Sequence, residues 1–302
     1  MLLPVTAGVD GSAESLAAAA WAAREAARQD RPLHLVHALA WHPQRRDDDS
    51  TGAAGRHLAR RALRQAEERV RAERPGVRLT DEQLEGPATA ALLKAADRSG
   101  LLVLGSRGLS GFTGFLVGSV ALGVVARAAC PVVLVRADEE EADEHLPAGD
   151  GGASTNTGHR DVVLAVDLGE ACDEVIEFAF EAARLRDARL RAVHAWHTAG
   201  PVGLGLGTGD IGLVRESWQG EEWLGFLKAV LQVWRDKYPD VEVLETVVED
   251  RPSSALVRAA TGAGLLVVGH RVTERPVGPR TGPVTHAAIH HVGCPVAVVP
   301  HF

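Results

Sequence analysis

The chain has 302 residues, a formal net charge of −8 and three cysteines. This length suggests two domains, each large enough to bury a core. The acidic balance gives no electrostatic reason to expect nucleic acid or an anionic membrane surface as a partner. The cysteines are an odd, widely spaced set without a CxxC pair, which argues against a disulfide framework and a zinc site and favours a cytoplasmic location.

The sequence contains two copies of one pattern. A Val-Asp pair that ends at Asp10 recurs 157 residues later at Asp167, and a Cys-Pro pair that begins at Cys130 recurs 164 residues later at Cys294. A period this long indicates duplicated domains rather than a solenoid, whose repeats run to about 20–50 residues. The expected units are an N-terminal domain (1–136), a linker (137–160) and a C-terminal domain (161–302).

Short apolar runs alternate with longer amphipathic segments, which is typical of parallel strands joined by crossover helices. In the first copy the expected strands are Val5–Val9, Leu33–Ala38, Val77–Leu84, Leu101–Gly105 and Val132–Val135. The expected helices are Ala13–Gln29, His57–Glu73, Ala88–Ser99 and Ser119–Ala129, with Ser12 as the first N-cap and a polar loop at 44–55. Each copy is therefore predicted to be an α/β domain, a five-stranded parallel sheet flanked by helices.

The second copy repeats this order after the linker. Its expected strands are Val162–Val166, Leu190–His194, Val241–Val247, Leu265–Gly269 and Val296–Val299. Its second helix has apolar residues at helical spacing: Trp223, Phe226, Leu227, Val230, Leu231 and Trp234. This spacing predicts a stripe that faces the core or an interface, and an aromatic ligand cage is the alternative. The acidic run Asp138–Glu141 is interpreted as part of a flexible, solubilising linker.

Glycines follow the fourth strand of the first copy. Gly105 and Gly108 would let backbone N–H groups approach an anion closely, and Gly118 and Ser119 would open a helix whose first N–H groups favour phosphate. In an open parallel sheet, ligands collect beyond the carboxyl ends of the strands. We therefore expect an anion site at this loop, with a merely structural turn as the alternative.

Two further strand ends face the same crevice. Asp10 follows the first strand, where its carboxylate would accept from a ribose hydroxyl or help to hold Mg²⁺ through water. Val36, His37 and Ala38 end the second strand, where their backbone would read an adenine edge. His37 and its equivalent His194 are interpreted as hydrogen-bonded strand-end histidines, the alternative being a contact with the ligand.

The combination Gly-x2-Gly-x9-Gly-Ser, Val-Asp-Gly-Ser at the first strand and Cys-Pro-Val-Val before the last resembles the universal stress protein family. The resemblance spans nearly the whole chain as two tandem domains. It implies Rossmann-like domains of the adenine nucleotide alpha hydrolase-like type, ATP with Mg²⁺, a regulatory role in stress or dormancy through an unidentified protein partner, and dimerisation through the last strand. The residues implied to surround the nucleotide are Asp10, Ala38, Gly105, Arg107, Gly108, Gly118, Ser119 and Val120.

The second copy departs from this motif. Val272 stands where the second glycine belongs, and Pro283 replaces the serine after Gly282, which removes a hydroxyl and a backbone N–H. We expect the second copy to bind nucleotide poorly and to serve as a pseudo-partner. The edge strands Val132–Val135 and Val296–Val299 are expected to pair as an internal pseudo-dimer, and pairing of two chains as a homodimer stays open.

No residue is predicted to be catalytic, because the sequence contains no Walker lysine motif, nucleophile elbow or kinase signature. A slow ATPase or nucleotidyl-transfer enzyme, and a scaffold that acts by protein contacts without nucleotide, are the alternatives. His286 and His290 are interpreted as a solvated helix face rather than a metal site. The N-terminus lacks the pattern of a signal peptide, and the apolar stretch 114–135 is interrupted by Arg127 and Pro131, so no membrane span is expected.

Overall fold

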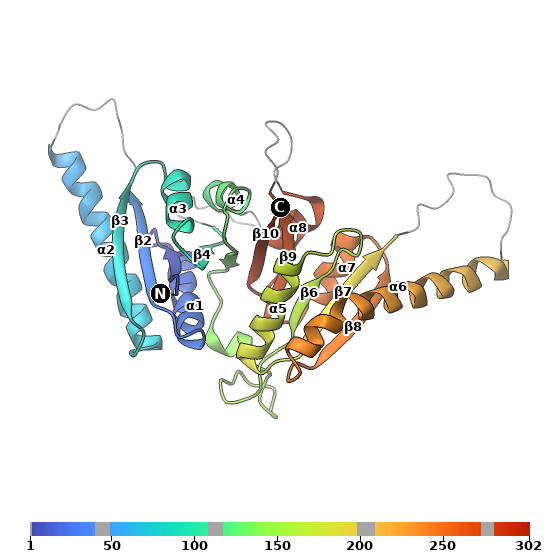
Figure 1. Ribbon diagram of the computed structural model, residues 1–302. Coiled ribbons are helices and arrows are strands. Elements are labelled where there is room, and N and C mark those ends of the chain that lie inside the picture. Colours follow the sequence, from blue (N-terminus) through green and yellow to red (C-terminus); the bar gives the residue numbers. More distant parts are fainter. Residues whose placement is uncertain (1, 40–48, 108–116, 198–208, 273–280) are drawn as a thin grey trace.

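The computed structural model describes residues 2–39, 49–107, 117–197, 209–272 and 281–302, with only the backbone for 49–54 and 209–218. Its strands are β1 Val5–Gly8, β2 Leu33–Leu39, β3 Leu79–Glu85, β4 Leu101–Gly105, β5 Val132–Val135, β6 Val162–Ala165, β7 Leu190–Trp196, β8 Val243–Glu249, β9 Leu265–Arg271 and β10 Val296–His301. They form one ten-stranded sheet in the order β3-β2-β1-β4-β5-β10-β9-β6-β7-β8 (Figure 1). The predicted α/β class, with five parallel strands in each half, is confirmed.

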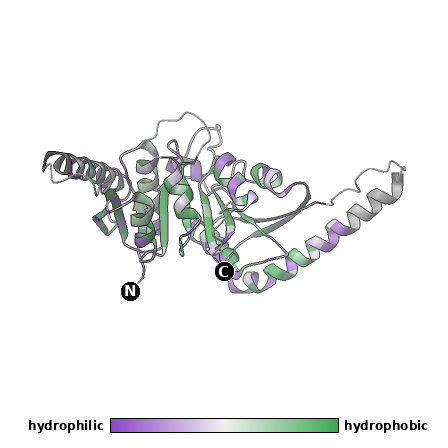
Figure 2. Ribbon diagram, turned by 90° about the horizontal axis from the view of Figure 1, so that it is seen from above, coloured by the Kyte–Doolittle hydropathy of each residue, from purple (hydrophilic) through white to green (hydrophobic). Residues whose placement is uncertain are grey.

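Helices cover both faces of the sheet. They are α1 Ala13–Arg28, α2 Asp49–Glu73, α3 Ala88–Ala96, α4 Ser119–Val125, α5 Asp173–Arg186, α6 Gly209–Lys237, α7 Pro252–Ala259 and α8 Pro283–His291, with the 3₁₀ turn η1 Glu141–Glu144. One apolar core lies under α1, α2, α5 and α6, and a second lies under α3, α4, α7 and α8. The strands between these layers are coloured mainly as hydrophobic (Figure 2).

The local sequence predicted the bounds of α1 accurately and the ends of the other helices less accurately. The side chain of Ser12 accepts from the backbone N–H of Ser15 at 3.2 Å, which confirms the predicted N-cap. By contrast, α2 begins at Asp49, inside the expected loop, because the polar first turns carry no apolar stripe that periodicity could detect. α3 and α4 end at Ala96 and Val125, three and four residues before their expected ends.

The two halves meet at the predicted edge strands. β10 pairs antiparallel with β5 in the register Val296–Leu134, Ala297–Val133 and Val298–Val132, so the predicted pairing is confirmed. Each edge supplies the hydrogen bonds that the other lacks. Each half is internally parallel, but the two halves run antiparallel to one another. The carboxyl ends of the strands of one half therefore lie on the opposite side of the sheet from those of the other half. Any ligand sites at these ends are therefore far from one another.

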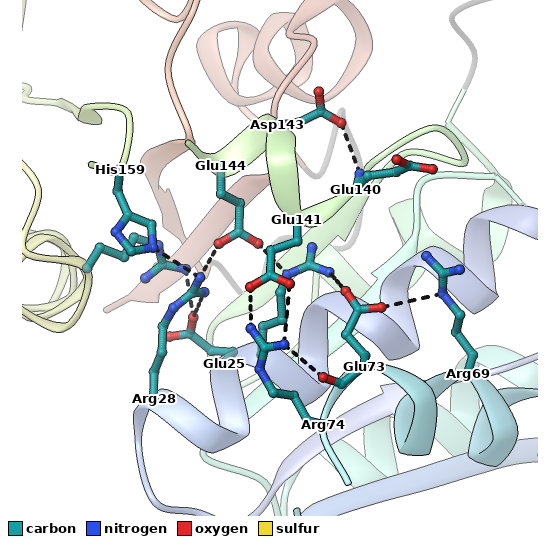
Figure 3. A network of polar contacts seen from close by, with 12 residues as sticks. Glu25, Arg28, Arg69, Glu73, Arg74, Glu140, Glu141, Asp143, Glu144 and His159 are labelled. Carbon is teal, nitrogen blue, oxygen red and sulfur yellow. Dashed lines mark hydrogen bonds and ion pairs between the residues drawn. The ribbon is translucent and has the colours of Figure 1, made fainter. Parts of the chain in front are cut away.

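The acidic segment between the halves corrects one expectation. Asp138–Glu141 was predicted to belong to a flexible, solubilising linker, but Glu139 is buried and η1 continues to Glu144, whose exposed fraction is 1%. The Glu144 carboxylate accepts from Arg24 Nε at 2.7 Å. It also accepts from Arg28, which like Arg24 lies on α1 (Figure 3). The segment folds inward because buried arginines of the first half require counter-charges.

The same ion network connects the two halves. Arg24 also contacts Glu73 of α2 at 2.6 Å, and Arg186 of α5 donates to Glu25 of α1 at 2.6 Å. Although burial alone would raise it, Arg28 and Arg24 lower the pKa of Glu144 to about 2. A buried carboxylate held in this way is ionised at neutral pH and stabilises the junction only while its arginine partners are present.

Helix α6 lies at the outer end of the second half and projects beyond the sheet (Figure 1). Leu227 and Leu231 are fully buried, which confirms a core-facing stripe at these positions, whereas Phe226 is exposed. No helix in the described part of the chain is long and apolar enough to cross a membrane.

Candidate functional sites

The N-terminal half contains a cavity of about 270 Å³ at the carboxyl ends of β1, β2 and β4. Its walls include seven of the eight residues predicted from the motif: Asp10, Ala38, Gly105, Arg107, Gly118, Ser119 and Val120. The eighth, Gly108, lies outside the described residues. The fold thus brings together side chains from four separate segments at one edge, as expected for an open parallel sheet.

Hydrogen bonds fix the polar groups at the floor of this cavity. The Oδ1 atom of Asp10 accepts from Ser12 N at 2.9 Å and from Ser12 Oγ at 2.5 Å, so the carboxylate is held beside the start of α1. His37 Nδ1 lies 2.8 Å from the carbonyl oxygen of Val9. Since a carbonyl oxygen only accepts, Nδ1 donates this hydrogen bond, and in the neutral imidazole Nε2 is then an acceptor. The interpretation of His37 as a hydrogen-bonded strand-end histidine is confirmed.

Close packing explains why position 105 is a glycine. A Cβ at this position would lie 2.7 Å from Cβ of Glu14 and 2.9 Å from the backbone nitrogen of Ser15, so only glycine lets α1 approach β4 this closely. Glu14 also lies 3.3 Å from Arg107 Nε, which fixes the arginine at the rim of the cavity. Close packing of α1 therefore shapes the site whether or not an anion is bound.

Sequence reasoning missed the apolar wall of the cavity. Ala88 and Leu92 come from α3, and Leu104 comes from the end of β4. The signal was available in principle, because α3 starts at the same edge of the sheet as the glycine loop. Its residues carry no distinctive chemistry, and only the packing of α3 against the sheet shows which of them turn towards the cavity.

The C-terminal half has an equivalent cavity of about 260 Å³ at the opposite edge. Asp167, His194, Leu256 and Gly269 line it and occupy the repeat positions of Asp10, His37, Leu92 and Gly105. His194 Nδ1 lies 3.0 Å from the carbonyl oxygen of Val166, which repeats the geometry of His37. The half of the cavity formed by the ends of β6 and β7 is thus retained.

The other side of this cavity has changed. Pro283 occupies the first turn of α8, where its ring removes a backbone N–H. The hydroxyl of Thr285 donates to the carbonyl oxygen of Gly269 at 3.1 Å, and Arg271 is paired with Glu170 at 2.5 Å. Arg271 is thus paired with a glutamate, as Arg107 is with Glu14 in the N-terminal half, while Pro283 at the start of α8 is a difference between the two cavities on this side.

A thiol also lines the C-terminal cavity. Cys172 Sγ lies 3.1 Å from Nδ1 of His301, which extends β10 beyond the length of β5. Burial and nearby Glu174 raise the pKa of this thiol, so it is protonated at neutral pH and is not an activated nucleophile.

No metal cluster is present in the portions of the chain that the structure describes: no group of three or more His, Cys, Asp or Glu side chains is arranged to hold an ion. His286 is exposed on α8, as interpreted from the sequence, and its ring centroid lies 4.2 Å from that of His290. His290 itself is buried, so the interpretation of a solvated face is wrong for this residue, which turns towards the sheet.

Comparisons with known proteins agree with the duplicated architecture. The model of the universal stress protein family matches residues 1–136 and again 158–300. A universal stress protein of Mycobacterium tuberculosis strain H37Rv is 32% identical over 302 residues, which cover 97% of this chain and 96% of that protein. One from Mycolicibacterium smegmatis is 30% identical over 306 residues, covering 98% and 96%. The crystal structure of a universal stress protein from Archaeoglobus fulgidus superimposes with a TM-score of 0.69 at 16% identity and 98% coverage of both chains, which is a likeness of fold.

Proposed function

Because the chain belongs to the universal stress protein family as a tandem pair of its domains, we propose that it is a regulatory stress-response protein that binds ATP in its N-terminal half. The C-terminal half acts as a pseudo-partner that does not bind the triphosphate. The observation that supports this most is the convergence of seven motif residues around one cavity.

The lining groups match the parts of a nucleotide. The apolar wall of Ala88 and Leu92 suits a base, and the backbone of Ala38 lies where it would hydrogen-bond the base edge. Asp10 is placed to accept from a ribose hydroxyl. Arg107 and the serine hydroxyl of Ser119 supply donors for phosphate oxygens.

Mg²⁺ would be bound mainly through the phosphates. This ion keeps several waters and usually takes one or two protein carboxylates together with substrate phosphates. Asp10 is the carboxylate in the N-terminal cavity that would contact such an ion through water. The bound cation would neutralise phosphate charge beside an otherwise acidic floor.

The cavity favours binding over turnover. A general base must lie within reach of an attacking water, and Asp10, the acidic side chain among the described lining residues of this cavity, is assigned here to the ribose and to Mg²⁺. We therefore propose a sensor whose output is a partner protein, acting in the cytoplasm, rather than an enzyme. A steady-state assay of ATP turnover separates this function from the slow ATPase or nucleotidyl-transfer alternative.

Titration calorimetry with ATP and Mg²⁺ tests the proposal, using the full chain and Ser119→Pro, which imports the residue of the second half. We expect one site per chain in the parent protein and at least about tenfold weaker binding in the variant, since a hydroxyl and a backbone N–H that would face charged oxygens are lost. Pro283→Ser is the matched control and should leave ATP affinity unchanged. Absence of binding to the parent chain would instead support the scaffold alternative.

A further inference from the structure

Helix α6 presents a second apolar stripe, which faces away from the core. Leu227 and Leu231 are fully buried, whereas Phe226 and Val233 on the outer side are 53% and 70% exposed. Ala229, which lies between them along the helix, is exposed as well. Spacings of three and four residues place Phe226, Ala229 and Val233 on one face of the helix. These three residues form the α6 seam, an apolar row that is open to solvent.

The equivalent helix of the first half carries charges instead. α2 follows β2 as α6 follows β7, and both pack on the same core layer. The exposed positions of α2 in the stretch 60–71 are all charged: Arg60, Arg61, Arg64, Glu68, Arg69 and Arg71. Single apolar residues are common on protein surfaces, but the shared fold does not require an aligned row of them. The α6 seam therefore indicates a contact with a partner.

The side chains along this face are arranged symmetrically about one point. The midpoint of Phe226 and Val233 along the chain is also the midpoint of Glu222 and Lys237. The two charged residues are exposed and lie four residues beyond the ends of the seam, on the same face. When two copies pack this helix antiparallel across a twofold axis at the midpoint, each phenylalanine faces a valine of the other copy. Each glutamate then faces a lysine, so the charges favour this register.

The groups around the seam are compatible with such a contact. Lys237 donates to Glu177 of α5, and half of its side chain stays exposed. An ammonium group has three donors, so it can also bind a carboxylate of a second copy. Asp236, beside Lys237, accepts from Gln232 at 2.8 Å. Glu222 and Lys237 are about 22 Å apart along the helix, which makes a small interface and favours a dissociation constant in the micromolar range.

The strand edges at the centre of the sheet are already occupied. β5 and β10 pair with one another inside the chain, so a second copy needs a different surface. We propose that α6 is this surface, and that two copies of the chain associate through an antiparallel pair of α6 helices. Phe226 packs against Val233 of the other copy, and the pairs of Glu222 with Lys237 close both ends of the seam. This association goes beyond the proposed function and does not depend on ATP.

Sedimentation equilibrium of the full-length chain, at concentrations that span the micromolar range, tests this with Val233→Asp and Lys228→Asp. We expect a monomer–dimer equilibrium in the parent chain and at least about hundredfold weaker association in Val233→Asp, because each dimer would bury two aspartates. Lys228 is also exposed but lies on the far side of the helix from the seam. Lys228→Asp is the matched control and should associate like the parent chain. Thermal unfolding by circular dichroism confirms that both variants fold.

Charge reversal examines the register of the two helices. Glu222→Lys should weaken association about tenfold, because a lysine then faces Lys237 at both ends of the seam. Adding Lys237→Glu to the same chain should restore association, since the two charges are exchanged across the axis. A parent chain that is monomeric throughout the range, a Val233→Asp protein that associates like the parent, or a double variant no tighter than Glu222→Lys would overturn the inference.

Discussion

Glu144→Gln is expected to lower the free energy of unfolding by about 3–5 kcal/mol, the usual cost of removing one partner from a buried ion pair. The carboxylate of Glu144 is 1% exposed and lies between Arg24 and Arg28. A neutral amide keeps the shape of the side chain but leaves the buried guanidinium of Arg24 and the partly buried guanidinium of Arg28 short of negative charge. Urea unfolding at pH 7 measures the difference.

Glu141 offers the control on the same 3₁₀ turn. It pairs with Arg74, and both side chains are partly exposed, so Glu141→Gln should change the free energy of unfolding by about 0–1 kcal/mol. Equal effects of the two substitutions would contradict the assignment of Glu144 as the buried centre of the junction.

Acid should reproduce the effect of Glu144→Gln in the parent protein. Burial raises the pKa of Glu144 and the arginines lower it, to about 2 in the folded state, against an ordinary value of 4.5. A group whose folded pKa is depressed contributes stability above its unfolded pKa and loses that stability as the pH falls through the folded value. The parent chain should therefore lose stability between about pH 4.5 and 2, and the part due to Glu144 should be absent from Glu144→Gln.

Glu139→Gln is expected to stabilise the protein at pH 8.5 by a few kcal/mol, since each unit of pKa difference corresponds to about 1.4 kcal/mol. Glu139 is 6% exposed, and its Oε1 has no hydrogen-bond partner within the described ranges. Burial, followed by the nearby charges of Glu144 and Asp143, raises the pKa of Glu139 to about 8. The folded protein thus holds this carboxyl group in its protonated form at neutral pH.

The sign of this effect is opposite to that of Glu144. Because the folded pKa of Glu139 lies above the ordinary 4.5, its contribution is fully present below pH 4.5 and is lost as the pH rises towards 8. Denaturation at pH 5, 7 and 8.5 should show a growing advantage of Glu139→Gln over the parent chain. Glu140→Gln, at the exposed neighbouring position, is the control for the substitution itself. A profile of Glu139→Gln parallel to that of the parent would show that Glu139 does not titrate in this range.

Much of the fold could be predicted from local pattern. The repeated Val-Asp pair and the apolar runs placed all ten strands, and the alanine-rich stretch after Ser12 predicted α1 together with its cap. These features are readable because strand and helix periodicity is local, and because a parallel sheet places the ends of its strands at one edge. The pairing of β5 with β10 was expected because exposed edges invite partners and because the family resemblance implies contact through the last strand.

Where the prediction from the sequence was wrong, the structure of the segment depends on residues that are distant in the chain. An acidic run has the composition of a solvated linker, and only the tertiary structure brings Arg24, 120 residues away, to Glu144 and buries both. Likewise, His301 reaches Cys172 across 129 residues, and Nε2 of His194 is buried by its surroundings rather than by its neighbours in the chain. The sequence by itself determined the two domains and the motif around the N-terminal cavity. The tertiary structure decided which charges are buried and which walls of the second cavity survive, because burial and pairing arise between segments whose separation in the chain carries no local signal.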